Sequence, residues 1–368
     1  MLIWFLFLLL LFFLLALYSK VTYNDKRKLF YVITVLLVYF SAFRDGLGMD
    51  YAGYVDICNR IREFPEDVKL FSEPIYVWFT NFICSSIFSH VLFFIVTSIV
   101  INTVCSYVYF KSYGYAIAIF FYVCFPFLYI FSFNITRQFF VASVFLLISY
   151  FWCYQDTQEG QRTKKFFLIG LLCCMFFIHK SSILLIPVLL GYKFHIRPIW
   201  ASIILGITFL IPFSNITGLS TFMTIMEGLD YDIYMDYDSS GISKFSLTNI
   251  YLNFITIVSI FTINKSLNNR VSKISVNVQF YRFSYLMIFY CMIAMNMCAN
   301  GFNVMYRVAT YFLVFFPVVI GLLPRLIRKE WAYCIIILPT MILLMTRFLS
   351  GDELLLPNRI LPIFSIFK

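Results

Sequence analysis

Long apolar runs, free of charge, divide this sequence from its first residues onward. The opening run, MLIWFLFLLLLFFLLALY, has neither a preceding basic region nor a small-residue cleavage site, so it predicts a membrane span rather than a cleaved signal peptide. The whole chain is 62% hydrophobic and 12% charged, whereas soluble domains are roughly 25% charged. Because the runs are continuous and do not alternate every second residue, they favour helices over a β-barrel. The sequence predicts one all-α, polytopic integral membrane domain over residues 1–368.

About twelve segments are apolar enough to be transmembrane helices, although several are shorter than the roughly 20 residues of an upright span. An additional run at 75–89 is interrupted by polar residues near its middle, and predicts a re-entrant or interfacial helix. The alternative, a true span there, would reverse the topology downstream. The turn at 177–182 is predicted to join two short arms rather than to kink one helix. The predicted spans are 2–18, 29–43, 91–109, 115–133, 138–154, 165–178, 181–192, 198–213, 249–263, 282–298, 307–323 and 331–348.

Basic residues are unevenly divided between the predicted loops. The loops at 20–28, 162–165, 193–197, 265–273 and 325–329 are all basic, and the positive-inside rule places such loops in the cytoplasm. The inner face then holds 17 basic and 4 acidic residues, and the outer face 11 basic and 14 acidic ones. Topology therefore explains the net charge of +10, and no nucleic-acid partner is expected.

Two polar segments face outward in this topology. The loop 44–73 carries 11 of the chain's 46 Lys, Arg, Asp and Glu residues. The larger loop 214–248 contains the acidic and aromatic stretch MEGLDYDIYMDYDSSG. Carboxylates that bind hydroxyls, next to rings that stack on sugar faces, predict glycan binding by this loop, and a solvated acidic loop is the alternative. The stretch lacks the glycine and distal glutamate of an EF-hand calcium loop.

The ten cysteines form no CxxC pair and no Cys/His metal-binding spacing, so we expect them to behave mostly as small hydrophobic residues. The GxGxxG, GxxxxGK[ST] and HExxH patterns are also absent. Nucleotide-binding and zinc-protease functions are therefore not indicated.

Several ionisable residues adjoin or enter the predicted spans, where a charge is costly and indicates function. Taken singly, the arginines could be helix-end anchors, the histidine a buried hydrogen-bonded side chain, and the carboxylates ion-pair partners. Arg137 fits this explanation poorly because Asn134, Thr136 and Gln138 surround it with polar groups. All of these residues are predicted on the outer side, and this clustering favours a site. The residues concerned are Arg44, Asp50, Glu73, Arg137, His179, Lys180 and Arg307.

This combination suits a lipid-linked diphosphate at the outer membrane surface. Arginine keeps its charge when desolvated, and its planar fork binds phosphate oxygens in pairs. A histidine or a carboxylate can act as general base toward a hydroxyl. Guanidinium groups would stabilise a departing diphosphate without a metal. The residues therefore predict glycosyl transfer from a polyprenyl-diphosphate donor.

Four short motifs follow one another between residues 40 and 190. Together they resemble the EpsG-like family of Wzy-type O-antigen and exopolysaccharide polymerases. One departure is Ile75, which replaces the glycine of the family's EPG triplet. The second half matches in architecture only, with Arg307 in the place of a late functional arginine. The motifs are an arginine followed by G-x-D-Y-x-x-Y (Arg44, Gly48, Asp50, Tyr51, Tyr54), an acidic–proline step (Glu73–Pro74), N-x-x-R-Q (Asn134, Arg137, Gln138) and H-x-S-[SA] (His179, Ser181, Ser182).

The resemblance implies a GT-C-like helical polymerase of the bacterial inner (cytoplasmic) membrane with its active site facing the periplasm. Such an enzyme moves a growing glycan from undecaprenyl diphosphate onto another lipid-linked repeat unit, in the biosynthesis of lipopolysaccharide O-antigen or of another surface polysaccharide. Its implied partners are the lipid-linked donor and acceptor, the bilayer and a chain-length regulator protein. No metal or other cofactor is implied.

Within this scheme we expect Arg137 and Arg307 to hold the diphosphate, with Arg44 assisting. His179 or Asp50 would be the base. Glu73 would orient an arginine or a sugar at the catalytic centre. Further substrate contacts are expected from Asn134, Gln138, Lys180, Tyr51 and Tyr54.

Two other functions remain open from the sequence. A flippase for lipid-linked oligosaccharide also needs arginines at membrane depth, but such transporters show internal repeats, which this chain lacks. A membrane acyltransferase that modifies surface sugars would also use a histidine, but nothing in the sequence marks an acyl-donor site.

Overall fold

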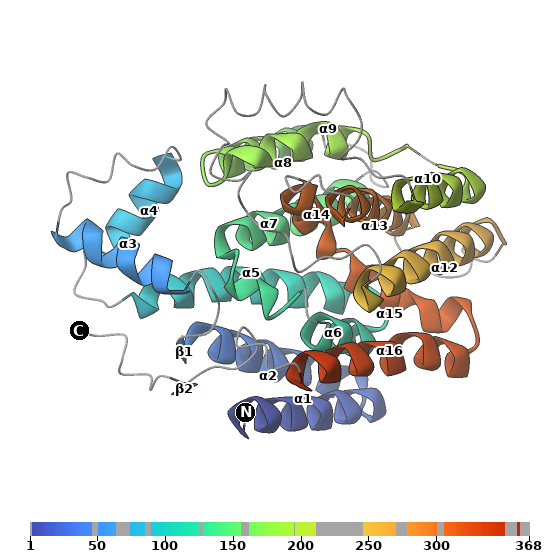
Figure 1. Ribbon diagram of the computed structural model, residues 1–368, viewed down its shortest axis with the longest axis horizontal. Helices are drawn as coiled ribbons and strands as arrows, with labels where there is room; N and C mark the ends of the chain where they lie inside the picture. The colour runs from blue at the N-terminus through green and yellow to red at the C-terminus, as the bar shows by residue number, and fades with distance from the viewer. Residues whose placement is uncertain are drawn as a thin grey trace.

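The computed structural model describes residues 2–45, 51–63, 74–84, 90–125, 128–155, 162–194, 196–210, 246–269, 278–299, 305–349 and 359–360. Most of its helices run side by side in one bundle (Figure 1). The predicted all-α, polytopic membrane fold is confirmed. In chain order the helices are α1 (Leu2–Lys20), α2 (Tyr23–Ala42), α3 (Tyr51–Glu63), α4 (Pro74–Cys84), α5 (Val91–Lys111), α6 (Tyr115–Cys124), α7 (Thr136–Gln155), α8 (Arg162–Phe176), α9 (Leu185–Leu190), α10 (Pro198–Leu210), α12 (Leu247–Asn269), α13 (Val278–Ala299), α14 (Met305–Leu313), α15 (Phe316–Leu326) and α16 (Lys329–Leu349).

Each of the twelve predicted spans overlaps a helix of the structure. Among the described residues, six helices are long and apolar enough to cross a membrane, or seven if the bent pair α14–α15 counts as one span. Helix α2 is also 20 residues long, but its first turns are highly charged. The other apolar helices have 10–17 residues.

Two predicted spans are interrupted, each beside a proline. The segment 115–133 is not continuous, because α6 ends at Cys124 and a short 3-10 helix, η2 (Phe131–Phe133), follows it. The segment 307–323 bends by 51° between α14 and α15. Pro126 and Pro317 lie at these interruptions, and proline breaks helices because it lacks an amide hydrogen and its ring clashes with the preceding turn.

The segment after Pro74 forms a helix too short to cross a membrane upright. Helix α4 has 11 residues, whereas a span needs roughly 20. The amides of Ile75 and Tyr76 donate to the carbonyl of Phe177 at 3.2 and 3.4 Å, so α4 begins against the turn after α8. Figure 1 shows α3 and α4 set to one side of the bundle, near the start of α5. This short helix fits a re-entrant or interfacial segment, whose last residues, 85–89, lie outside the described residues.

The segment around His179 forms two short arms, as predicted. Helix α8 is followed by a 3-10 helix, η3 (Lys180–Leu184), and then by α9. At the start of α8, the Lys165 ammonium lies 5.2 Å from the ring centroid of Trp152 on α7 and 5.5 Å from that of Tyr192, just after α9. The chain therefore returns to the end of the bundle from which it started.

Basic residues gather at this same end of the bundle. The Tyr113 amide, after α5, donates to Tyr281 Oη on α13 at 2.7 Å. The Arg325 guanidinium at the end of α15 lies 3.4 Å from the Tyr113 ring centroid. Gln279 on α13 donates to the Tyr192 carbonyl at 3.1 Å. We call this end, which carries Lys111, Lys165, Lys193, Arg282 and Arg325, the basic end.

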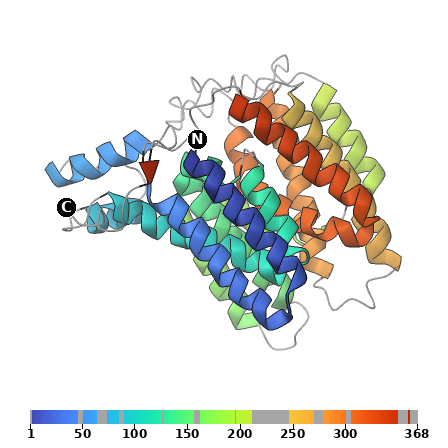
Figure 2. The same cartoon turned by 90° about the horizontal axis from the view of Figure 1, so that it is seen from below.

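Buried polar groups and close backbone contacts hold the bundle together. Asn253 on α12 and Asn296 on α13 exchange amide hydrogen bonds of 2.9 and 3.0 Å. Gly321 on α15 packs so closely against the chain before α6 that a Cβ there would lie 2.4 Å from the Tyr113 carbonyl oxygen. Figure 2 shows the long helices from below, with α1 and α2 side by side along the bundle. In a membrane such polar pairs and small residues support helix association.

Candidate functional site

Five segments from different parts of the chain meet at the end of the bundle opposite to the basic end. The convergence follows from the helix directions, because α2, α7 and α8 each have their other end at or near the basic end. We call this region the arginine end. Its segments are the end of α2 with Arg44, helices α3 and α4, the start of α7 with Arg137, the turn from α8 into η3 with His179, and the start of α14 with Arg307.

Arg44 is a charged side chain enclosed by protein. It is 1% exposed, and its guanidinium donates to the carbonyls of Ser41 and Phe133. The ring centroids of Phe94 and Phe133 lie 4.5 and 4.6 Å from its Cζ. Within the described part of the chain, no carboxylate forms an ion pair with Arg44, and its Nε has no hydrogen-bond partner. A buried positive charge in this state favours an anion nearby.

Tyr51 and Tyr54 lie behind the aromatic ring that Arg44 contacts. The Tyr51 ring stacks on Phe94 with centroids 5.0 Å apart, and its hydroxyl lies 3.3 Å from His90 Nε2. Tyr54 packs against Phe93 at 5.2 Å. Both tyrosines are buried, so here they help to position the aromatic partner of Arg44. Their direct contact with substrate stays a prediction.

Arg137 stands at the start of α7 and is half-buried. Its Cζ lies 4.5 Å from the ring centroid of Tyr76 on α4. Tyr76 in turn approaches Phe93, the neighbour of Phe94, with ring centroids 6.4 Å apart. A continuous line of aromatic rings thus joins the surroundings of Arg137 to those of Arg44. Arg137 also lines a pocket of about 100 Å³ between α4, α5 and α7.

The start of α14, which carries Arg307, is tied to α7 by the glutamine next to Arg137. The Gln138 side chain donates to the backbone carbonyl of Arg307 and so ties α7 to the start of α14. Gln138 is 4% exposed and Asn134 is 7% exposed, whereas the Arg307 side chain is half-buried. The polar residues around Arg137 therefore include one that positions the start of α14.

His179 immediately precedes the 3-10 helix η3 and is buried. Its ring centroid lies 6.3 Å from that of Tyr311 on α14, and the hydroxyls of Ser181 and Tyr311 are 2.7 Å apart. Lys180 is exposed at the start of η3. Because α4 also begins on the Phe177 carbonyl, the turn with His179 contacts both α4 and α14.

Cys58 and Cys84 correct the prediction about cysteines. They form a disulfide between α3 and α4, with Cα atoms 5.1 Å apart, within the usual range for such bonds. The sequence did not reveal it, because the two residues are 26 positions apart and match no local motif. Five of the other eight cysteines are buried.

The chain's C-terminal segment also reaches the arginine end. The short strands β1 (Arg44–Asp45) and β2 (Arg359–Ile360) pair antiparallel, with Arg44 opposite Ile360 and Asp45 opposite Arg359. The pairing adds a backbone contact that no sequence pattern indicated.

Sequence reasoning missed two residues of the site and selected others that the structure does not describe. Tyr76 stacks with Arg137, and Tyr311 contacts the turn with His179. Tyr311 lies four residues after Arg307, and this helical spacing was an available signal. Asp50, Glu73 and residues 214–245 of the loop 214–248 lie outside the described residues.

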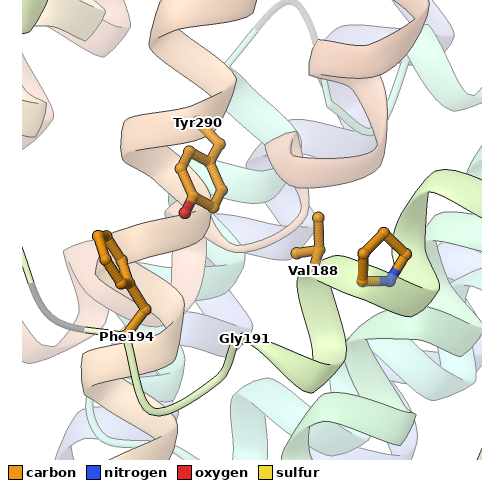
Figure 3. A pocket seen from close by; sticks show the side chains of 5 residues that line it. Val188, Gly191, Phe194 and Tyr290 are labelled. Atoms are coloured by element: carbon orange, nitrogen blue, oxygen red, sulfur yellow. The ribbon is translucent and has the colours of Figure 1, made fainter.

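A second hollow lies away from these residues. It has a volume of about 350 Å³ and is lined by Pro187, Val188, Gly191, Phe194 and Tyr290. Figure 3 shows the Phe194 and Tyr290 side chains on one side and Val188 on the other. None of its described lining residues is charged, and none is a predicted site residue. We therefore take the arginine end as the candidate functional site.

These observations define a multi-pass helical membrane protein with arginines gathered at one end of its bundle. Comparison with protein families matches residues 27–362 to the EpsG family. The chain belongs to the EpsG family and is a polysaccharide-polymerase-like membrane protein of polysaccharide biosynthesis. No curated protein and no solved structure matches the chain. The likeness to a GT-C arrangement therefore stays a prediction.

Proposed function

We propose that this protein polymerises oligosaccharide repeat units linked to undecaprenyl diphosphate into a long surface polysaccharide, such as an O-antigen or exopolysaccharide. The observation that carries the proposal is Arg44, which is 1% exposed and has no carboxylate partner in the described part of the chain. Arg137 and Arg307 begin helices at the same end. Three guanidinium groups suit a membrane-bound diphosphate, which has about four non-bridging oxygens that can accept hydrogen bonds or face positive charge.

The proposed reaction is a metal-independent glycosyl transfer. A base takes the proton from an acceptor hydroxyl, whose oxygen then bonds to the anomeric carbon of the growing glycan. The bond between that carbon and the diphosphate oxygen breaks, and undecaprenyl diphosphate leaves with the electron pair. Arg137 and Arg307 would stabilise its charge directly, while the buried Arg44 would add to the positive potential. His179 or Asp50 would be the base.

Two observations support a site that faces the periplasm of a bacterial inner membrane. The basic end lies opposite the arginine end, and basic loops are retained in the cytoplasm. The disulfide between Cys58 and Cys84 also lies at the arginine end, and disulfides persist in the oxidising compartment outside the cytoplasmic membrane.

Mutant strains test this function. Arg137→Ala, expressed in a strain that lacks the wild-type gene, should leave single repeat units on the surface lipid in place of long chains. The matched control is Arg325→Ala, because Arg325 also stacks on a tyrosine but lies at the basic end. It should give normal chain lengths, with both variants present in the membrane at wild-type amounts.

Other outcomes identify other functions. If long chains persist in Arg137→Ala, this residue is not required to bind the diphosphate. Complete absence of glycan from the surface of the deletion strain would indicate a flippase. Full-length chains that lack a sugar modification would indicate an acyltransferase.

A further inference from the structure

The pocket beside Arg137 is bounded by aromatic side chains on several helices. Helix α4 contributes Tyr76, Trp78 and Phe79, helix α5 contributes Phe93, and helix α7 contributes Phe140 together with Arg137. Among the described residues of the lining, Arg137 is the only charged one. The pocket thus combines apolar walls with one positive charge.

The charge is fixed at the wall of the pocket by its stacking on Tyr76. The Arg137 Cζ lies 4.5 Å from the Tyr76 ring centroid, a distance at which a cation is attracted to the ring face. Stacking through one face keeps the guanidinium plane at the pocket wall, and the N–H donors along the edge of such a plane bind an anion's oxygens in pairs. A ligand that matches this pocket has an anionic head and an apolar chain.

The pocket continues onto an exposed aromatic surface of α4. Trp78 lines the pocket and yet is 68% exposed, and Phe82, one helical turn later, is 69% exposed. Their rings stack with centroids 5.9 Å apart. Large exposed aromatic side chains on a membrane protein contact lipid near the bilayer surface. The apolar path therefore runs from Arg137 to the lipid-facing side of α4.

The pocket beside Arg137 and the exposed aromatic surface of α4 together form what we call the groove. We propose that this groove binds the first isoprene units of the polyprenyl carrier and leads its diphosphate to Arg137. This inference rests on the proposed function, which requires such a carrier at the arginine end. The groove also ends next to the candidate base His179, because the neighbouring residue Ile178 is part of its lining. Helix α4 then acts as the binding element for the lipid, and its disulfide to α3 holds it in position.

Photo-crosslinking tests the groove without requiring polymerisation. A benzophenone amino acid is placed at position 78 of the full chain, which is reconstituted in liposomes with radiolabelled undecaprenyl diphosphate that carries no glycan. The control position is 331, because Trp331 is 63% exposed but lies at the start of α16. We expect at least fivefold more label at position 78 than at position 331. Unlabelled undecaprenyl diphosphate should compete, and phosphatidylglycerol should not.

Equal labelling at both positions, or equal competition by phosphatidylglycerol, would overturn the proposal and leave α4 as an ordinary lipid-contacting helix. Labelling should also fall several-fold in Arg137→Gln, since the charge holds the headgroup. A kinetic experiment gives an independent readout. With the glycan-bearing lipid, Trp78→Ala should raise KM about tenfold, whereas Trp331→Ala should leave KM unchanged. An unchanged KM in Trp78→Ala would contradict the groove.

The two proposals fail in different ways. Specific labelling at position 78 by a protein that elongates no glycan would support the groove and refute the polymerase function. Glycan elongation without labelling at position 78 would support the polymerase function and refute the groove.

Discussion

Replacing Arg44 by methionine should separate the functional contribution of this residue from its contribution to folding. The guanidinium is 1% exposed, and burial of a charge costs several kcal/mol. Two charge-assisted hydrogen bonds to the Ser41 and Phe133 carbonyls return about 1.5–3 kcal/mol each. Contacts with the Phe94 and Phe133 rings return about 0.5–2 kcal/mol each. The opposing contributions are therefore similar in size.

Methionine keeps a comparable volume and its apolar contacts but needs no counter-charge. Replacement of a buried charged group by a well-packed apolar one is often neutral, or stabilising by about 1–4 kcal/mol. We therefore expect the free energy of unfolding of Arg44→Met to lie within about 2 kcal/mol of the wild-type value, or above it. At the same time the variant should make no long-chain glycan, because the positive charge for the diphosphate is lost.

The assay is denaturation of the purified protein in detergent, with and without farnesyl diphosphate as a soluble probe for the headgroup. A ligand that binds only the folded state raises its stability by about 2.7 kcal/mol at one hundred times its Kd. The wild-type midpoint should rise with the probe, and the midpoint of Arg44→Met should rise less. Loss of more than about 4 kcal/mol in Arg44→Met, without the probe, would show that Arg44 is required for folding. An equal rise in both proteins would refute its role in anion binding.

Three further predictions concern contacts that hold the fold and the site. Gly321→Ala places a methyl group 2.4 Å from a backbone oxygen and should cost about 1–3 kcal/mol through overpacking, which a lower denaturation midpoint would reveal. Asn296→Leu leaves the Asn253 amide without its two bonds of 2.9 and 3.0 Å and should destabilise by about 1–3 kcal/mol, whereas the double variant with Asn253→Leu should recover part of this loss. Cys84→Ser breaks the disulfide with Cys58, which closes a loop of 26 residues, and should lower the free energy of unfolding by about 3–4 kcal/mol. A denaturation midpoint of the wild-type protein that a reductant leaves unchanged would contradict this prediction.

Much of the helical bundle could be predicted because the membrane makes the sequence pattern strict. Apolar runs must become helices in lipid, so each predicted span overlaps an observed helix. The sequence also predicted that Arg325 and Lys165 lie at the opposite end of the bundle from Arg137 and His179, since charges cannot lie in the hydrocarbon without cost. The interruptions at Cys124 and at 314–315 were missed, although Pro126 and Pro317 marked both.

Contacts between distant residues could not be predicted in the same way. The burial of Arg44 between Phe94 and Phe133 depends on how α2, α5 and η2 pack, and periodicity carries no information about that packing. The disulfide of Cys58 depends on the angle between α3 and α4. The sequence placed its charged candidates on one side of the membrane, and those that the structure describes lie at one end of the bundle, while their roles stay predictions. It missed their aromatic partners, because rings are common throughout a chain that is 21% aromatic.

Reconstituted polymerisation tests the central claim most directly. Purified protein in liposomes is given one chemically defined undecaprenyl-diphosphate-linked repeat unit, and glycan length is measured together with released undecaprenyl diphosphate. We predict glycans of several repeat units, one released undecaprenyl diphosphate for each bond formed, and neither product with Arg137→Ala. Glycans that stay at a single repeat unit with the wild-type protein, or elongation that persists undiminished in Arg137→Ala, would contradict the account.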